Sequence, residues 1–245
     1  MMTRNGHKTY PLTVAQKFHF YYMNFCPYKE VVNVGTSLTI EYELDIDELR
    51  RAIYKAYERC ESMRVRFCYD KKEDKWYQYL VEKEEREIEY VDFSDKTMEE
   101  AGEIMTAWTR VPFEREDSPM NRIVIIKTPD GCQGVYLLGD HMLLDAQSLI
   151  CFLSDVIQIY CNVKFEGIPY PAEMRSYFEQ LQKDLEYEAG SKAQQRDREY
   201  FYKKNRGVGA DFQRHRRPRS FGGYAQDESQ CEGGVFGYGK YEVGA

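Results

Sequence analysis

Long apolar runs and closely paired cysteines are both missing from this chain of 245 residues. No stretch approaches about 18 consecutive apolar residues, the length of a membrane helix, and Met1 to Phe25 lacks the apolar segment of a signal peptide. The seven cysteines are scattered without CxxC spacing, which favours buried thiols in a reducing compartment over a disulfide framework or a zinc site. We therefore expect a cytoplasmic protein with no membrane span and no bound metal.

An excess of positive charge is also absent, because 34 lysines and arginines face 41 acidic residues and give a formal net charge of -7. A nucleic-acid partner requires a basic surface, so nucleic acid is not expected here. What the chain does contain is 42% hydrophobic residues, with 21 Tyr and 13 Phe. This composition is typical of a folded, aromatic-rich protein that is long enough to bury a core.

Capping signals and periodicity predict the secondary structure. Thr13 and Asp45 each precede a helical pattern, and Gln16 and Glu48 stand three residues further on, which predicts two capped helices. Further helices are expected over 97–110, 147–161, about 174–185 and 194–204. Strands are expected over 34–44, 63–69, 75–81, 88–93, 122–127 and 133–139. The last two are continuously apolar, which predicts strands covered on both faces, whereas the charged run 82–89 predicts a solvated edge.

This order of elements predicts an α+β fold, a mixed β-sheet with the helices over 47–59 and 147–161 packed on it. Residues 8–206 form the predicted lobe. From 207 to 245 glycine is frequent, and Arg214 to Arg219 is a basic run. We interpret this last segment as a tail or linker.

One segment points to chemistry: Asp140-His141-Met142-Leu143-Leu144-Asp145-Ala146 leads from a buried strand through a tight turn into a helix. A histidine at a strand end is held rigidly, which suits an imidazole that takes a proton from an attacking amine or hydroxyl. Asp145 is close enough to fix the turn through hydrogen bonds or an arginine. Two other interpretations stay open: a structural histidine, and a ligand set for a hard cation or iron made by Asp140, His141 and Asp145.

The segment resembles the His-His-x-x-x-Asp-Gly motif of nonribosomal-peptide condensation domains, which is shared with chloramphenicol acetyltransferase-like enzymes. Three further motifs of that family read Pro-Leu-Ser/Thr-x-x-Gln, Arg-His-Glu-x-Leu-Arg-x-x-Phe and Pro-Phe-Asp…Pro-Leu-x-Arg. Their counterparts here, in the same order, are Pro11-Leu12-Thr13-Val14-Ala15-Gln16, Arg59-Cys60-Glu61-Ser62-Met63-Arg64-Val65-Arg66-Phe67, and Pro112-Phe113-Glu114 with Pro119-Met120-Asn121-Arg122. Glu199-Tyr200-Phe201 matches a later Tyr-Trp-containing helix, so the resemblance extends from Tyr10 to about Lys204.

The resemblance implies a chloramphenicol acetyltransferase-like fold of two lobes with a channel between them, of which this chain is the N-terminal lobe. His141 is expected beside the thioester and the incoming nucleophile as the central catalytic residue. Asp145 is expected to assist by pointing inward to a cation, Arg64 or Arg122, that holds the loop. Structural roles near the junction of sheet and helix are expected for four residues of the matched motifs: Arg59, Glu61, Arg64 and Arg122. For Glu61 a solvated helix end is the alternative.

Two channel positions depart from the family's motif. Asp140 replaces the first histidine and adds a negative charge beside His141, which favours an imidazolium unless the carboxylate is turned away. Ala146 replaces the glycine and adds a methyl group to the channel. The family's second lobe, with its Asp-Phe-Gly-Trp-Gly segment, is absent from this sequence.

The implied function is acyl transfer to an amine or hydroxyl. The acyl donor is a thioester on the phosphopantetheine arm of a carrier protein or on coenzyme A, with no cofactor bound to the chain itself. The implied partners are an acyl- or peptidyl-carrier protein and either a second lobe or further copies of the chain. Two alternatives remain: a non-catalytic half that binds a carrier protein or a partner lobe, and an incomplete gene product without function.

Overall fold

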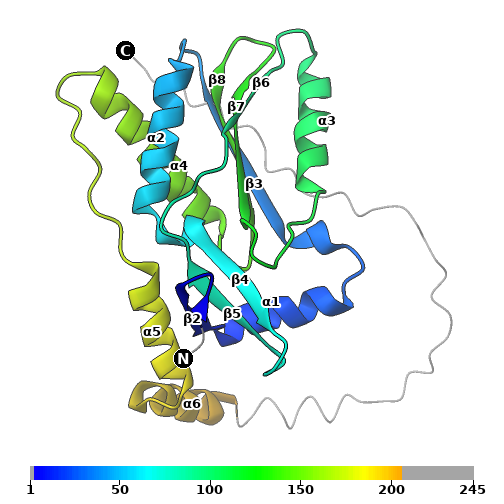
Figure 1. The fold of residues 1–245 in the computed structure, drawn as a ribbon, viewed down its shortest axis with the longest axis vertical. Coiled ribbons are helices and arrows are strands. Elements are labelled where there is room, and N and C mark those ends of the chain that lie inside the picture. The colour runs from blue at the N-terminus through cyan, green and yellow to red at the C-terminus, as the bar shows by residue number, and fades with distance from the viewer. Residues whose placement is uncertain (1–2, 206–245) are drawn as a thin grey trace, which may run out of the picture. The chain divides into compact units, whose positions relative to one another are not determined.

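The computed structural model describes residues 3–205 (Figure 1). Residues up to Arg196 belong to one compact unit, and α6 (Lys192–Asn205) extends beyond it into a second. The predicted tail over 207–245 and the predicted boundary at 206 lie outside the described residues.

A mixed β-sheet forms the centre of this unit. It consists of β3 (Asn33–Ile40), β6 (Glu89–Asp92), β7 (Asn121–Lys127) and β8 (Gln133–Asp140) in the order β3-β8-β7-β6. Only β6 and β7 pair in parallel, and the other neighbours in this sheet are antiparallel. The predicted mixed sheet is thus confirmed.

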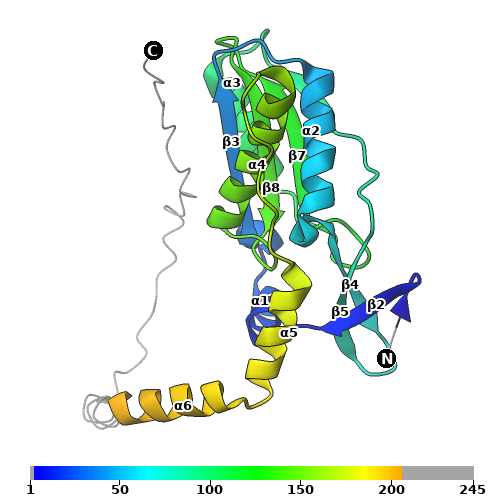
Figure 2. The same ribbon diagram turned by 90° about the vertical axis from the view of Figure 1, so that its left-hand side faces the viewer.

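Helices cover both faces of the mixed sheet. Figures 1 and 2 show α2 (Ile46–Arg59) and α4 (Ala146–Lys164) on one face, with α3 (Met98–Thr109) on the other. Alternate residues of β7 and β8 pack against the helices on opposite faces of the sheet. The residues that face α2 and α4 are Ile123, Ile125, Val135 and Leu137. Those that face α3 are Val124, Ile126, Tyr136 and Leu138. Because every second side chain faces the opposite layer, two covered faces explain the continuous apolar runs in the sequence.

Helix α4 is long and apolar enough to cross a membrane, judged by length and hydropathy alone. Seven of its residues are buried in the protein, and one of them, Asp155, is ion-paired with Arg59 of α2. The apolar stripe of α4 is already packed against α2 and the sheet. We therefore interpret α4 as a core helix.

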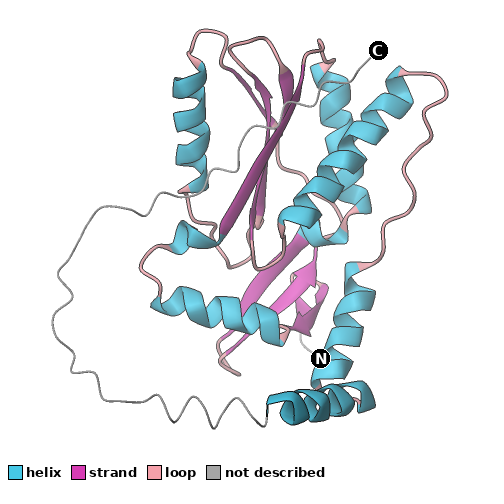
Figure 3. Ribbon diagram, turned by 180° about the vertical axis from the view of Figure 1, so that it is seen from behind, coloured by secondary structure: helices cyan, strands magenta, loops and turns pink. Residues whose placement is uncertain are grey.

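A second, fully antiparallel sheet is an unexpected element. It has the order β1-β2-β5-β4, with β1 (Thr3–Arg4), β2 (His7–Pro11), β4 (Val65–Asp70) and β5 (Lys75–Leu80). Helix α1 (Val14–Phe25) crosses this sheet, as Figure 3 shows from behind. Helix α5 (Tyr177–Glu188) joins it through a buried cluster in which the Tyr177 hydroxyl donates to the Gln78 side-chain carbonyl at 2.7 Å. The same amide oxygen accepts from Gln16 of α1 at 3.1 Å.

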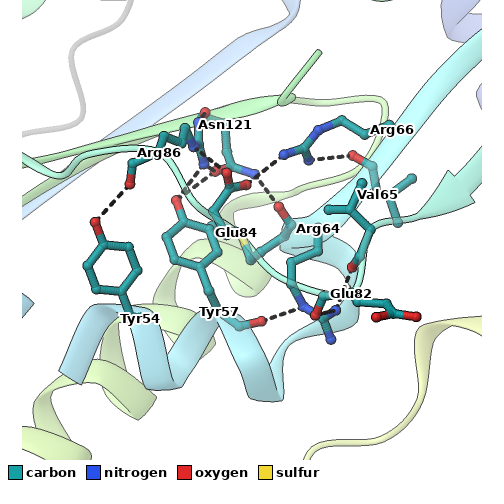
Figure 4. A network of polar contacts seen from close by, with 11 residues as sticks. Tyr54, Tyr57, Arg64, Val65, Arg66, Glu82, Glu84, Arg86 and Asn121 are labelled. Carbon is teal, nitrogen blue, oxygen red and sulfur yellow. Dashed lines mark hydrogen bonds and ion pairs between the residues drawn. The ribbon is translucent and has the colours of Figure 1, made fainter. Parts of the chain in front are cut away.

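A buried ionic network joins the two sheets (Figure 4). Arg66 of β4 donates to Glu84 at 2.6 Å, and both side chains are buried, with 6% and 5% of their surface exposed. Glu84 also pairs with Arg86 at 3.2 Å, and Arg86 reaches Tyr57 of α2 and Asn121 of β7. The expectation that 82–89 is only a solvated edge is wrong at Glu84, because this one carboxylate turns inward to neutralise two guanidinium groups.

Candidate active site

The turn that carries His141 is fixed by the residue before it. Asp140 ends β8 with only 2% of its surface exposed, and its carboxylate accepts from the Met142 amide at 2.8 Å and from Arg115 at 3.3 Å. The Asp140 carbonyl accepts from the Leu143 and Leu144 amides. The backbone of this turn is therefore held from inside by one buried side chain and its carbonyl.

His141 leaves this turn with its side chain exposed, while its backbone N–H donates to the Val32 carbonyl at 2.8 Å. Its ring stacks on the ring of His19 from α1, with centroids 5.4 Å apart and planes inclined by 21°. The placement of His141 at a strand end is as predicted. An exposed imidazole on a rigid turn can exchange protons with a molecule that approaches from solvent.

Of the two roles expected of Asp145, the structure shows hydrogen bonding and not the inward pairing with an arginine. Its carboxylate caps α4 by accepting from the Ser148 amide at 2.8 Å and the Ser148 hydroxyl at 2.6 Å, and it is exposed. These hydrogen bonds hold the pKa of Asp145 below its usual value, with a small further contribution from His141. The predicted inward ion pair is wrong, because the helix start lies at the surface and its free amides take the carboxylate.

The two arginines predicted as partners of Asp145 are engaged elsewhere. Arg64 is buried and donates to four backbone carbonyls at the end of α2 and after β5. Arg122 lies over the ring of Trp108 and pairs with Glu89 at 2.7 Å. In place of an Asp145 pair, the turn has the ion pair between Asp140 and Arg115. The carboxylate at the position of the first motif histidine thus holds the loop.

Arg59, Glu61 and Arg64 each bind another part of the fold. Arg59 donates to Asp155 at 2.9 and 3.2 Å and so joins α2 to α4. Glu61 accepts from the Ser176 hydroxyl at 2.7 Å and the Phe178 amide at 3.2 Å, which places it at the start of α5 rather than at a solvated helix end.

The cleft predicted around His141 stays a prediction, because the two hollows that can be described lie elsewhere. Two hollows of about 460 and 360 Å³ lie around Lys127–Gln133 and around Trp108–Phe113, and His141 lines neither. Ala146 is the first residue of α4 and is exposed, so its methyl group narrows no channel within the described residues. Within the described residues His141 is exposed at the surface.

The side chains of Asp140, His141 and Asp145 point to different partners and do not form a shared ligand set. Among residues 3–205 no group of three or more His, Cys, Asp or Glu side chains is arranged to hold a metal ion. Sequence reasoning missed two contributors to the site, His19 and Arg115. Each comes from a segment far from the motif, and no local spacing connects them with it.

Comparison with known proteins gives a consistent family. The family described as Condensation domain matches residues 6–226. Among curated proteins, the hybrid PKS-NRPS synthetase pvhA of Talaromyces variabilis is 23% identical over 74% of this chain. Surfactin synthase subunit 2 of Bacillus subtilis (strain 168) is 28% identical over 66%. Each alignment covers 4% of the relative.

Solved structures give the same result for the fold. The starter condensation domain of rhizomide synthetase RzmA has a TM-score of 0.72 and 18% identity, covering 82% of this chain and 48% of that one. The first condensation domain of the CDA synthetase has a TM-score of 0.66 and 20% identity, with 82% and 51% covered. The chain therefore spans about half the length of these solved domains.

Proposed function

Since this chain belongs to the condensation domain family, we propose that it takes part in acyl transfer with His141 as the central residue. The donor is a thioester on a carrier protein or on coenzyme A, and the acceptor is an amine or a hydroxyl. The observation that carries the proposal is the exposed His141 ring on a turn fixed from inside by Asp140. The Asp140 carboxylate is buried and bound to Arg115 and to the backbone of the turn, while His141 stays exposed, so the departure from the motif leaves the ring accessible.

The chemistry requires little of the lobe beyond a placed imidazole. The acceptor's lone pair attacks the thioester carbonyl, a C–N or C–O bond forms, and the C–S bond breaks. The proton lost by the acceptor ends on the departing thiol, and the His141 ring can carry it between the two. Holding both reactants beside one rigid ring contributes through proximity.

Thioester donors are supported by what the solved relatives contain. A variant of the RzmA starter domain was solved in complex with C8-CoA, and another with C8-CoA and Leu-SNAC. The likeness of this chain to those domains is a likeness of fold. We therefore propose the class of donor, an acyl thioester, without choosing an acyl group.

A partner surface is supported by the outer face of α1. Five large apolar side chains lie there at helical spacing and are 50–86% exposed: Val14, Phe18, Tyr21, Tyr22 and Phe25. Exposed aromatic patches of this kind mark interaction sites. We propose that a second lobe or a further copy of the chain covers this face, with a carrier protein as the delivering partner.

The six cysteines of the described residues are free thiols, which supports a reducing, cytoplasmic setting.

The second candidate function is a non-catalytic half that binds a carrier protein or a partner lobe. It is favoured by the exposure of His141 at the surface of residues 3–205. It is also favoured by Asp140, which occupies a motif position but binds Arg115 and the backbone of the turn.

The deciding experiment offers the purified chain acyl-carrier and acyl-coenzyme A thioesters with a panel of amines and alcohols. We expect His141→Ala to abolish transfer while the melting temperature stays within about 2 °C, because an exposed ring contributes little packing. His7→Ala is the matched control, since His7 also stacks on an aromatic ring but belongs to β2. Absence of transfer by the unmodified chain, or equal transfer by His141→Ala, would favour the binding half.

A further inference from the structure

The site contains two imidazoles, although the motif in this chain supplies only one. Asp140 stands where the family's motif has its first histidine, and its buried carboxylate binds the backbone of the turn. The second ring comes from His19 in the middle of α1, half-buried and stacked on His141 at 5.4 Å. A near-parallel stack of two rings restricts rotation of both.

The stack is useful only if α1 itself is held firmly, and several contacts hold it. Thr13 and Gln16 form a reciprocal capping box at its start. The Gln16 side chain is buried and bonds to Gln78 of β5 and Tyr177 of α5. These contacts fix the start of the helix against both neighbouring elements.

The middle of α1 is tied to the His141 turn through Phe20 as well. Arg115, which binds Asp140, lies over the ring of Phe20 with its guanidinium carbon 5.6 Å from the ring centroid. Phe20 also packs on Trp76 of β5, with centroids 4.7 Å apart. The turn and α1 are therefore connected twice, once through Asp140 and Arg115 and once through the stacked rings.

We propose that His19 is a positioning residue for His141, which restricts the orientation of the catalytic ring by stacking on it. This inference rests on the proposed function, since a positioned ring matters only if His141 takes part in transfer. His19 acts through its aromatic face, and a phenyl ring should replace it. The charged groups near the pair are Asp145 at the start of α4 and the Asp140–Arg115 pair of the turn.

The test compares His19→Ala and His19→Phe with the unmodified chain. Two readouts are taken: the rate at which diethyl pyrocarbonate modifies His141, followed by mass spectrometry, and the kinetics of acyl transfer. Modification of His7, which stacks on Tyr79, is the internal reference. Thermal unfolding of both variants checks that the fold is kept.

We expect His19→Ala to raise the modification rate of His141 by about 2- to 10-fold, the factor that an aromatic stack supplies. It should lower kcat by a similar factor with KM within about twofold, because orientation acts on the chemical step. His19→Phe should keep both quantities within about twofold of the unmodified chain. The rate at His7 should be the same in all three proteins.

An unchanged modification rate in His19→Ala would overturn the proposal, as would an unchanged kcat. A His19→Phe variant as defective as His19→Ala would also overturn it, because the imidazole would then act by its own chemistry. If the unmodified chain transfers no acyl group, the proposed function fails, and the modification rates still decide whether His19 restrains the ring.

Discussion

Replacing Glu84 by glutamine tests the buried network that joins the two sheets. The change removes one negative charge and keeps the shape of the side chain. Arg66 then loses the carboxylate that neutralises it at 2.6 Å, although the amide oxygen of glutamine can still accept a hydrogen bond and the bond from Arg66 Nη1 to the Val65 carbonyl remains. Arg86 is 25% exposed and keeps its bonds to Tyr57 and Asn121. The cost therefore arises mainly at Arg66.

Its magnitude follows from the burial of that guanidinium, which is 6% exposed. Breaking a buried ion pair leaves an uncompensated charge and costs about 3–5 kcal/mol. We expect Glu84→Gln to lower the free energy of unfolding by this amount. The free energy of unfolding of a domain is about 5–15 kcal/mol in total, so the variant should still fold but with a much reduced free energy of unfolding.

The assay is urea unfolding followed by tryptophan fluorescence, since Trp76 and Trp108 belong to the second sheet and to α3. Stability is compared by the midpoint at constant m-value. Glu85→Gln is the matched control, because Glu85 is the exposed neighbour in the same charged run, and it should change stability by less than about 0.5 kcal/mol. Replacing both Arg66 and Glu84 by methionine should cost less than Glu84→Gln alone, because no charge is then stranded. Equal losses for Glu84→Gln and Glu85→Gln would refute the reasoning.

Three further predictions concern other parts of the fold. Asp145→Ala should lower the free energy of unfolding in urea by about 1 kcal/mol through the lost cap of α4. Because the pKa of Asp145 is lowered on folding, the carboxylate stabilises the fold above about pH 4, and the effect of the substitution should fade in more acidic buffer. A larger loss of stability in acid than at neutral pH would contradict this. Gly134→Ala should lower the free energy of unfolding, measured by calorimetry, by about 3 kcal/mol or more, because the new Cβ would lie 1.9 Å from the Leu38 carbonyl oxygen. Gly131→Ala is the control: its Cβ would meet no atom within 4 Å, and only the positive φ of 87° opposes it. It should therefore cost only about 1 kcal/mol. Tyr177→Phe should lose about 1–2 kcal/mol of unfolding free energy, since its hydroxyl bonds to Gln16 and Gln78, and an unchanged midpoint would show that these amides satisfy each other.

Much of the fold could be predicted from local patterns. Thr13 and Asp45 cap α1 and α2 as their spacing indicated, because capping depends on neighbours three residues away. The two-sided burial of β7 and β8 followed from their composition. The short strands β1 and β2 were missed, since Thr3–Arg4 and His7–Pro11 are too short and too polar to show a period.

The site was predicted less completely, because its partners depend on tertiary placement. Asp140 and Asp145 are both acids near His141, and which one is buried depends on the end of β8 and on the placement of Arg115, neither of which the local sequence shows. Glu84 sits among exposed charges of the same type, so nothing local marks it as buried. His19 meets His141 only after α1 has crossed to the end of β8.

The ion pair between Asp140 and Arg115 also constrains how this chain could change in evolution. Restoring the family's histidine at position 140 would remove the carboxylate from Arg115, whose side chain is 17% exposed, and would free the Met142 amide. That single step is unfavourable unless Arg115 changes with it, so the two positions are epistatic. Close relatives that carry histidine at position 140 should therefore differ at position 115 as well.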